Sequence, residues 1–274
     1  MSRTRLGTAA NVGRPPLRLV LPAAAGSVFL VLPLMALVLS APWDRLWSIA
    51  TAPDARQALW LSAWTSTAAA ALCLFVGLPL AWVLARLDFP GRRLLRALVT
   101  VPLVLPPVVA GVALLTAFGR QGIVGAPLRE AFGTQIPYTS VAVVIAHTFV
   151  ALPFFVISME GALRATPSRL EIAAATLGAD RWTTFRRVTL PLAMPGLVAG
   201  LVLAWARSLG EFGATITFAG NYPGTTQTLP LLVYTRLQDD RDAAVGVSLL
   251  LLAVCVGVLV CLRERWWSHG RALP

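Results

Sequence analysis

Six long apolar runs restrict what this sequence can fold into more than any other feature. A helix needs about 20 predominantly apolar residues to cross the hydrocarbon core of a bilayer. With 57% hydrophobic and 13% charged residues, the chain is also more apolar than one soluble core requires. We therefore expect an all-α polytopic membrane protein with about six transmembrane helices. Their predicted limits are 17–40, 58–86, 97–119, 139–163, 190–218 and 243–262.

The arginines are distributed unevenly over the segments that connect these runs. Segments 86–96 and 164–187 and both ends of the chain are rich in arginine, whereas the other three links carry fewer arginines and hold acidic residues as well. Since cytoplasmic loops carry an excess of Lys and Arg, both termini are predicted to be cytoplasmic (N-in/C-in). The formal charge of +11 is then mainly a topology signal rather than the footprint of a nucleic-acid-binding module.

Several kinds of chemistry are excluded by residues that the sequence lacks. It contains no lysine, which a P-loop or a Schiff-base site requires. Cys73, Cys255 and Cys261 show no CxxC spacing and are expected to be packing residues. With only His147 and His269, an HExxH metalloprotease is ruled out. We therefore predict no catalytic residue, no metal site and no cofactor in this chain.

Prolines interrupt several of the apolar runs. Each proline removes a backbone hydrogen bond that lipid cannot replace, so the freed carbonyl groups need side chains, neighbouring helices or water. This favours a packed bundle around a polar path, although any single proline is explained equally well by a kink that fits two helices together. The prolines are Pro79, Pro102, Pro106, Pro107, Pro153 and Pro195.

The polar stretch "EIAAATLGADRWTTFRRVTLP" (171–191) separates the fourth and fifth runs and predicts two short helices. Thr166 with Pro167 is a typical helix start, and Ser168 with Glu171 offers an alternative capping box. Gly178 can take the left-handed conformation that ends the first helix.

Asp180 is expected to cap the second helix, on which Trp182, Phe185 and Thr189 share a face. A narrow apolar stripe runs along the first helix, and an isolated helix this short needs a surface to lie on. Periodicity leaves open whether that surface is the helix bundle itself or a groove on a cytosolic partner. The stripe consists of Leu170, Ala173, Ala174 and Leu177.

At this point the chain resembles a known family. "EIAAATLG", followed by Leu-Pro twelve residues after the glycine, is similar to the EAA loop of ABC-importer permeases. Ile172 departs from the pattern, because the position six before the glycine is usually acidic and Glu171 lies one residue earlier. The matching residues are Glu171, Ala173, Ala174, Gly178, Leu190 and Pro191.

This resemblance covers about residues 57–262. It implies the type I importer permease architecture in a bacterial cytoplasmic (inner) membrane, with a loop at 164–191 that docks on a nucleotide-binding subunit. The chain is accordingly divided into 1–56 (tail, first transmembrane helix and first link), 57–262 (permease core) and 263–274 (cytoplasmic tail).

The segment "RSLGEFGATITFAGNYPGTTQTLP" (207–230) places charges inside the fifth run. A lone charge near the bilayer centre costs at least about 2.5 kcal/mol, so Arg207 and Glu211, four residues apart, are expected to share a helix face and pair with each other. The pair is either purely structural or part of a path for an anion. The candidate path residues are Arg207, Ser208, Glu211, Thr215 and Thr217.

"GEFGATITFAGN" with "PGTTQTLP" is more similar to molybdate permease subunits than to sulfate permease subunits. The resemblance implies a homodimer, two cytosolic ABC ATPases that bind ATP and magnesium, and an extracytoplasmic molybdate-binding protein. It further implies molybdate or tungstate as the cargo, with sulfate or thiosulfate as the alternative.

Two functions of other classes lack the sequence features that typically mark them. An ATP-independent channel or carrier is typically marked by inverted repeats of broken helices, and no clear internal repeat is visible. An intramembrane enzyme built on His147 and Ser158 lacks a third catalytic partner and a GxSxG context.

Overall fold

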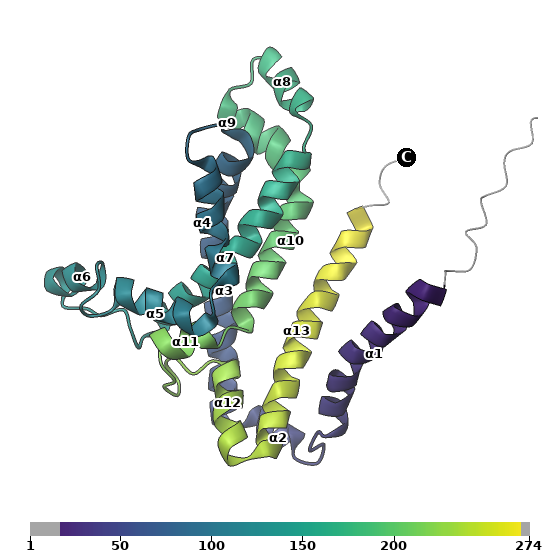
Figure 1. The fold of residues 1–274 in the computed structure, drawn as a ribbon, viewed down its shortest axis with the longest axis vertical. Coiled ribbons are helices and arrows are strands. Elements are labelled where there is room, and N and C mark those ends of the chain that lie inside the picture. The colour runs from purple at the N-terminus through teal and green to yellow at the C-terminus, as the bar shows by residue number, and fades with distance from the viewer. Residues whose placement is uncertain (1–16, 270–274) are drawn as a thin grey trace, which may run out of the picture.

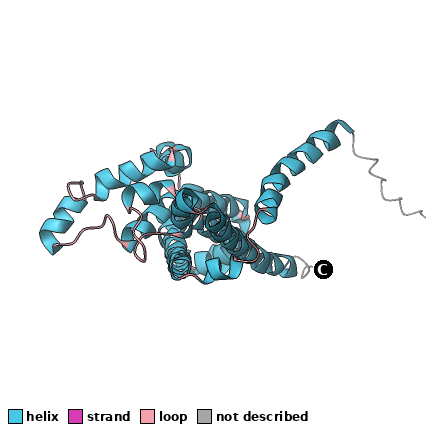
Figure 2. Cartoon of the chain, turned by 90° about the horizontal axis from the view of Figure 1, so that it is seen from below, coloured by secondary structure: helices cyan, strands magenta, loops and turns pink. Residues whose placement is uncertain are grey.

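The computed structural model describes residues 17–269, and every regular element in that range is a helix (Figure 2). The predicted all-α fold is thus confirmed. The elements in order are α1 (Leu17–Leu39), α2 (Leu46–Thr51), α3 (Pro53–Arg86), α4 (Arg92–Val104), α5 (Pro107–Phe118), α6 (Gly125–Phe132), α7 (Ser140–Ala165), α8 (Ser168–Thr176), α9 (Arg181–Thr184), the π-helical turn η1 (Phe185–Thr189), α10 (Leu190–Leu209), α11 (Gly213–Phe218), α12 (Leu229–Asp239) and α13 (Arg241–His269).

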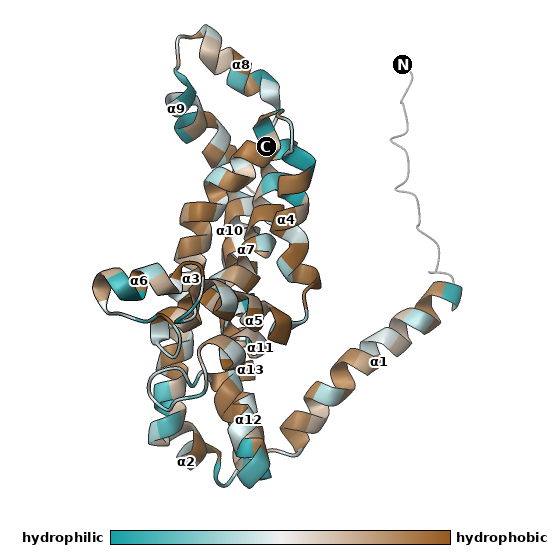
Figure 3. Cartoon of the chain, turned by 60° about the vertical axis from the view of Figure 1, so that its left-hand side comes forward, coloured by the Kyte–Doolittle hydropathy of each residue, from teal (hydrophilic) through white to brown (hydrophobic). Residues whose placement is uncertain are grey.

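Five of the predicted runs contain helices that are long and apolar enough to cross a membrane. They are carried by α1, α3, α7, the α9–α10 segment and α13, and a sixth span is obtained if the bent pair α4 and α5 counts as one. Figure 3 shows the corresponding apolar middle of the molecule between two more polar ends. The prediction of about six spans is therefore confirmed for the described residues.

The third run is not the straight helix that was predicted for 97–119. α4 stops at Val104, α5 starts at Pro107, and the two helix axes differ by 119°. Pro106 and Pro107 explain the break, because each removes an N–H donor and forces an extended backbone on the residue before it. Leu105 and Pro106 indeed have ψ angles of 131° and 136°. The run is a broken span or a re-entrant loop.

The fifth run is also shorter than predicted, because α10 ends at Leu209 and not near 218. Gly210 ends the helix, and the chain starts again as the separate helix α11 at Gly213. A Cβ atom at Gly213 would lie 2.4 Å from the Cβ of Pro107, so only glycine allows α11 to approach α5 this closely. The break between α4 and α5 and the break between α10 and α11 thus pack against each other.

The core of the bundle is formed by α3, α7 and α10, which pack along most of their lengths (Figure 1). Phe155 and Met159 of α7 are fully buried and belong to one cluster with Cys73 of α3 and Leu197 of α10. A second cluster joins α5, α7 and α11, and a third joins α2, α3, α12 and α13. These clusters fix the ends of α7 and α10 that carry the candidate sites.

α1 and α6 reach out on opposite sides of this bundle (Figures 1 and 2). The start of α1 and the end of α13 both point toward the end of the molecule that carries α8 (Figure 1). The arginine-rich segments 86–96 and 164–187 lie at that same end, so the fold agrees with the arginine distribution. The N-in/C-in orientation and the division at residues 56 and 262 remain predictions, and residues 1–16 and 270–274 lie outside the described part.

Candidate functional site

The hairpin, residues 164–191, stands beyond the end of the bundle (Figure 1). No residue of α8 is buried, and the side chain of Leu177 is 88% exposed. Leu170 and Ile172 are exposed as well. Within the described residues, the apolar stripe of α8 therefore does not lie on the chain's own bundle. Of the two surfaces that periodicity left open for this stripe, the helix bundle itself is wrong.

The start of α8 differs from the predicted capping pattern. The hydroxyl of Thr166 donates to the carbonyl oxygen of Ala162 at 3.1 Å, so Thr166 caps the end of α7 and does not cap α8. Pro167 occupies the cap position, which receives no side-chain hydrogen bond. The alternative capping box of Ser168 and Glu171 is also wrong, because the carboxylate of Glu171 points elsewhere.

Glu171 joins three segments that are far apart in sequence. Its Oε1 atom accepts hydrogen bonds from Nη2 of Arg86 at 2.7 Å and from Oγ1 of Thr189 at 2.8 Å. The same Nη2 atom of Arg86 donates to the carbonyl oxygen of Thr166 at 3.5 Å. Less than a quarter of each charged side chain is exposed, so solvent screens this pair only partly. α8 is therefore tied both to the end of α3 and to the turn that leads into α10.

The turn between α8 and α9 follows the prediction. Gly178 has a φ of +85°, and no atom lies within 4 Å of the position that a Cβ would take. The need for glycine is therefore conformational and not a matter of space. Asp180 caps α9 by accepting from the backbone N–H of Thr183 at 2.8 Å, and the hydrogen bonds from Thr183 lower the pKa of the Asp180 carboxyl.

The remaining hairpin residues have different surroundings. Ala173 is exposed and Ala174 is half-buried, whereas Leu190 packs against the main core cluster and Pro191 lies in the first turn of α10. In this way the glutamate, the glycine and the Leu-Pro pair position the hairpin, and the alanine side of α8 is left free for contact.

Further polar contacts hold the ends of the core helices below the hairpin. Oε1 of Glu160 accepts from Arg96 at 2.7 Å and from Arg164 at 2.8 Å. Arg92, Arg96 and Arg164 also donate to the carbonyl oxygen of Leu84, near the end of α3. Sequence reasoning used these arginines only as topology signals. The four-residue spacing of Glu160 and Arg164 was a local signal for their ion pair, whereas the other partners lie up to 80 residues away and show no such spacing.

The predicted ion pair of Arg207 and Glu211 is present, but the two residues do not lie on one continuous helix. Nη2 of Arg207 lies 2.8 Å from Oε2 of Glu211, whose side chain is 1% exposed. Glu211 lies beyond the end of α10, so the prediction that both share one helix face is wrong. Its other oxygen accepts from the backbone N–H of Ala214 at 2.8 Å and thereby satisfies the start of α11. The four-residue spacing holds because the chain turns at Gly210.

Several polar groups around this pair have no hydrogen-bond partner in the described part of the chain. They are the hydroxyls of Ser208 and Thr215 and both ring nitrogens of His147, all fully buried. His147 also lies within electrostatic range of Arg207. Thr217, in contrast, donates to the carbonyl oxygen of Gly213 at 2.8 Å. Buried polar groups are rarely left unpaired, so this region is built for something other than apolar packing.

The geometry contradicts the hypothesis of an intramembrane enzyme built on His147 and Ser158. His147 and Ser158 lie eleven residues apart on the single helix α7, which separates them by about 16 Å along its axis. The hydroxyl of Ser158 donates to the carbonyl oxygen of Gly196 at 3.1 Å and thus serves the contact between α7 and α10.

Comparison with known proteins agrees with this arrangement. Residues 77–267 match the family model described as binding-protein-dependent transport system inner membrane component. The chain belongs to this family. It is therefore a multi-pass, inner-membrane component of a transport system, and the alternative of a carrier that works alone is wrong, since the family's systems depend on a binding protein.

Curated relatives of the permease extend over nearly its whole length. This chain is 52% identical over 245 residues to the molybdenum transport system permease protein ModB of Mycobacterium tuberculosis. The aligned region covers 89% of this chain and 92% of that protein. ModB of Escherichia coli is 41% identical over 213 residues, covering 78% and 93%. The sulfate transport system permease protein CysT of Escherichia coli is 37% identical over 248 residues, covering 89% of both chains.

Solved structures share the fold of the permease. A chain of a bacterial alginate ABC transporter, crystallised with a periplasmic protein bound to an alginate pentasaccharide, has a TM-score of 0.71 at 17% identity and covers 89% of this chain and 90% of that one. A chain of the MetNI methionine ABC transporter has a TM-score of 0.58 at 20% identity, covering 74% and 90%. The expected fold of an ABC-importer permease is thereby confirmed.

Proposed function

We propose that this permease carries molybdate, and also tungstate, across the inner membrane by alternating access that is driven by ATP hydrolysis in a partner subunit. The observation that carries the proposal is the 52% identity to ModB over 89% of this chain and 92% of the relative. The similarity to CysT extends equally far along the chain but at 37% identity.

The hairpin is the proposed contact with the ATPase. Its exposed apolar stripe, centred on Ala173 and Ala174, is suited to a groove on a partner, and helix-in-groove recognition needs this kind of free face. Gly178 lets the chain reverse at the tip. Through Glu171, a displacement of α8 is passed to the end of α3 and, through Leu190 and Pro191, to α10.

The region around Arg207, Ser208, Glu211, Thr215 and Thr217 is the proposed translocation path. An oxyanion in transit is attracted by the guanidinium of Arg207, while the carboxylate of Glu211 keeps that attraction from becoming too strong for release. The unpaired hydroxyls of Ser208 and Thr215 supply neutral hydrogen bonds once the bundle opens.

The proposed complex contains two copies of the permease, two cytosolic ABC ATPases and an extracytoplasmic molybdate-binding protein. Cyclic dimers are the commonest assemblies, and two copies place two hairpins on one face. ATP and magnesium are bound by the ATPases, in keeping with a permease sequence that has no lysine for a P-loop. Membrane lipid surrounds the apolar faces, and no nucleic acid is involved.

Reconstitution tests this function directly. The permease, the ATPase and the binding protein are assembled in liposomes, and uptake of labelled molybdate is followed with ATP, without ATP, and with a non-hydrolysable analogue. We expect uptake only with hydrolysable ATP and only with the binding protein present. Uptake that is independent of ATP would contradict the proposal.

Sulfate or thiosulfate is the second candidate cargo, since CysT is similar over 89% of both chains. Competition distinguishes the two. If molybdate is the cargo, excess tungstate suppresses the uptake of labelled molybdate and excess sulfate leaves most of it intact. Suppression by equimolar sulfate would assign the permease to sulfate.

A further inference from the structure

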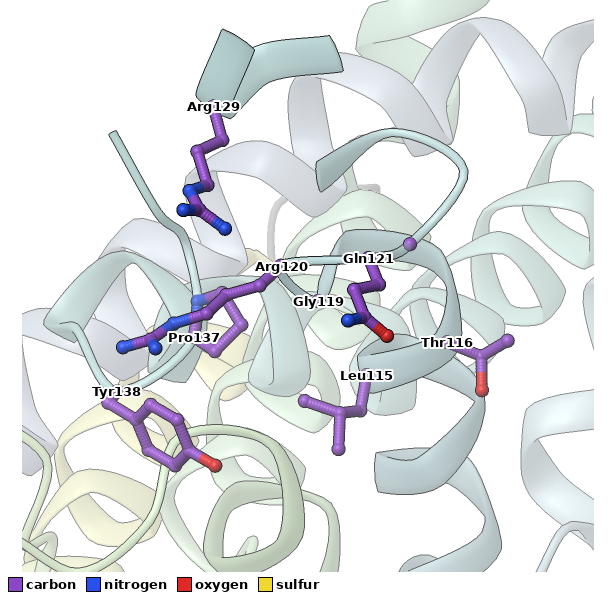
Figure 4. Close-up of a pocket in the computed structure, with 9 residues that line it drawn as sticks. Leu115, Thr116, Gly119, Arg120, Gln121, Arg129, Pro137 and Tyr138 are labelled. Atoms are coloured by element: carbon purple, nitrogen blue, oxygen red, sulfur yellow. The ribbon is translucent and has the colours of Figure 1, made fainter. Parts of the chain in front are cut away.

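A cavity of about 630 Å³ lies between the end of α5, the loop that leads to α6, and the start of α7 (Figure 4). Its polar lining comes from side chains that bind anions well: two guanidinium groups, an amide, a hydroxyl and a phenol. No carboxylate lines it. The polar residues are Thr116, Arg120, Gln121, Arg129 and Tyr138.

The two arginines of this cavity keep their charge unneutralised. Nε of Arg120 donates to Oε1 of Gln135, a neutral amide, which orients the guanidinium without cancelling its charge. The guanidinium of Arg129, in the last turn of α6, makes no hydrogen bond or ion pair in the described part of the chain, and it reaches from α6 toward the loop of Arg120 (Figure 4). The cavity therefore carries an excess of positive charge.

Another arginine-containing cavity of the molecule shows the opposite arrangement. In the cavity between α2, α3 and α12, Nη2 of Arg45 lies 3.5 Å from Oδ2 of Asp240, and Arg236 forms an ion pair with Asp54. There, each guanidinium has its own carboxylate, so the cavity has no net attraction for an anion. The α5–α6 cavity differs from this one in that no carboxylate is paired with its arginines.

The wall of the α5–α6 cavity is fixed by backbone constraints. A Cβ atom at Gly125 would lie 1.9 Å from the carbonyl oxygen of Gly119, so the loop can close only with glycine at that position. Tyr138 has a φ of +64°, a strained conformation for an aromatic residue. Its ring packs edge-on against the ring of Tyr222, with 6.0 Å between the two ring centroids. The cavity is therefore preformed, and strain of this kind often accompanies binding sites.

We propose that this cavity binds a tetrahedral oxyanion, and that its occupant is the transported dianion after release from the binding protein. The inference rests on the proposed function and on the predicted orientation, which puts the α5–α6 link outside the cell. Two guanidinium groups suit a tetrahedral oxyanion because each can donate two parallel hydrogen bonds. Both side chains are exposed, so binding is weak and sensitive to salt, as a stop on a transport path requires.

The test compares two double variants with the same change in charge. Arg120→Gln with Arg129→Gln removes both charges of the cavity. Arg56→Gln with Arg241→Gln removes two exposed arginines from links that are predicted to lie on the same side of the membrane but do not line the cavity. Copurification with the ATPase shows that each variant is folded and assembled.

Two quantities are measured for each purified complex: equilibrium binding of labelled molybdate without the binding protein, and molybdate imported per ATP hydrolysed with it. The cavity variant is expected to lose about tenfold in binding, the size expected when two partly solvated charge-assisted contacts are removed, and to import less per ATP. The control variant keeps both values. Raising the salt concentration weakens binding to the unmodified complex and leaves the cavity variant unaffected.

Contrary results are equally clear. Equal binding by the cavity variant and the unmodified complex, or an equal loss in the control variant, overturns the inference. An anionic phospholipid headgroup is the other source of a tetrahedral oxyanion. If the cavity binds only when phosphatidylglycerol is present and molybdate does not compete, the site is a lipid site and the inference is wrong.

The same measurements separate this inference from the proposed function. If the unmodified complex imports molybdate with ATP but the cavity variant behaves identically, the inference fails and the function stands. If the unmodified complex binds molybdate through Arg120 and Arg129 but does not import it, the function fails and the site stands. If the unmodified complex does not bind molybdate, the inference is wrong.

Discussion

The hairpin and the α10–α11 junction both contain a carboxylate that bonds an arginine, yet their surroundings are opposite. Around Glu171, the carboxylate bonds both a guanidinium and a hydroxyl, and the apolar residues of α8 are exposed. Around Glu211, the apolar residues are buried and several polar groups are left without partners. In the proposed function, the first region keeps its internal geometry while it contacts the ATPase, and the second changes its hydrogen-bond partners when the bundle rearranges.

Removing the buried carboxylate is expected to have the largest effect. In Glu211→Ala, the guanidinium of Arg207 loses its ion pair and the backbone N–H of Ala214 loses its acceptor. Breaking a buried pair typically costs about 3 to 5 kcal/mol, a large part of the stability of a folded domain. We expect little folded subunit in the membrane, measured by its level after extraction and by its thermal unfolding.

The double variant Arg207→Gln with Glu211→Gln sharpens this prediction. It removes both charges, so it is expected to recover much of the lost stability while transport stays low. If Glu211→Ala is as stable as the unmodified protein, the account of the buried junction is wrong.

Distorting the hairpin turn comes next. Gly178→Val places a β-branched residue at a φ of +85° and forces the tip of the hairpin to shift. Because a misplacement of about 1 Å can cost about a hundredfold in activity, we expect uptake to fall by about that factor with the subunit still inserted.

Gly91→Val is the matched control for this change. Gly91 has a φ of +89° and equally open surroundings, but it lies outside the hairpin. Normal transport by Gly178→Val, or an equal loss in Gly91→Val, would remove the special role of the hairpin turn.

Uncoupling α8 from the bundle is predicted to have a smaller effect. In Glu171→Gln the acceptor geometry is kept but the charge that holds Arg86 is lost. We expect uptake to drop about tenfold, since a partly buried charge-assisted contact is worth about 1.4 kcal/mol or slightly more. ATP hydrolysis should continue with less cargo moved per ATP.

A double-mutant cycle with Arg86→Gln measures whether the two residues act together. The account predicts that the second substitution adds little once the first is present. Fully additive losses would show that Glu171 and Arg86 serve the transporter independently.

The smallest effect concerns the cap of α9. Hydrogen bonds from Thr183 depress the pKa of Asp180 below its ordinary value of 3.8, so the cap stabilises the hairpin above that value and is lost as the pH falls through the lowered pKa. Protease sensitivity of the hairpin should therefore stay constant from about pH 5 to 8 and rise only below about pH 4.

Asp180→Asn keeps a good cap that does not titrate. Its protease sensitivity should be independent of pH over the whole range, apart from effects shared with the rest of the protein. A change near pH 6 in the unmodified protein but not in this variant would contradict the assignment.

Local sequence signals were sufficient for several features with a local cause, although the predicted cap of α8 was wrong. Apolar length predicted the spans, and the types of Gly178 and Asp180 predicted the turn and the cap. The spacing of Arg207 and Glu211 predicted their ion pair. In each case the partners lie within a few residues of each other, or the membrane itself imposes the pattern.

Features that depend on distant contacts escaped prediction. The break at Pro106 has a local cause and escaped prediction for another reason: hydropathy does not distinguish a straight span from a broken one, because both are equally apolar. The contact between Arg86 and Glu171 joins residues 85 apart, and the capping pattern suggested a local role for the glutamate instead. The α5–α6 cavity depends on the bend between α4 and α5, which carries Arg120 and Arg129 away from the bundle.

Cross-linking tests the central claim, that the hairpin docks on a cytosolic ATPase, most directly. A photo-crosslinker is placed at Leu177, which is 88% exposed on the hairpin, or at Ile123, which is 84% exposed on the α5–α6 link, in a complex assembled in native membranes. The account predicts that position 177 captures the ATPase and that position 123 does not. If position 177 captures no ATPase, or is labelled by a membrane-impermeant reagent from outside the cell, the account is wrong.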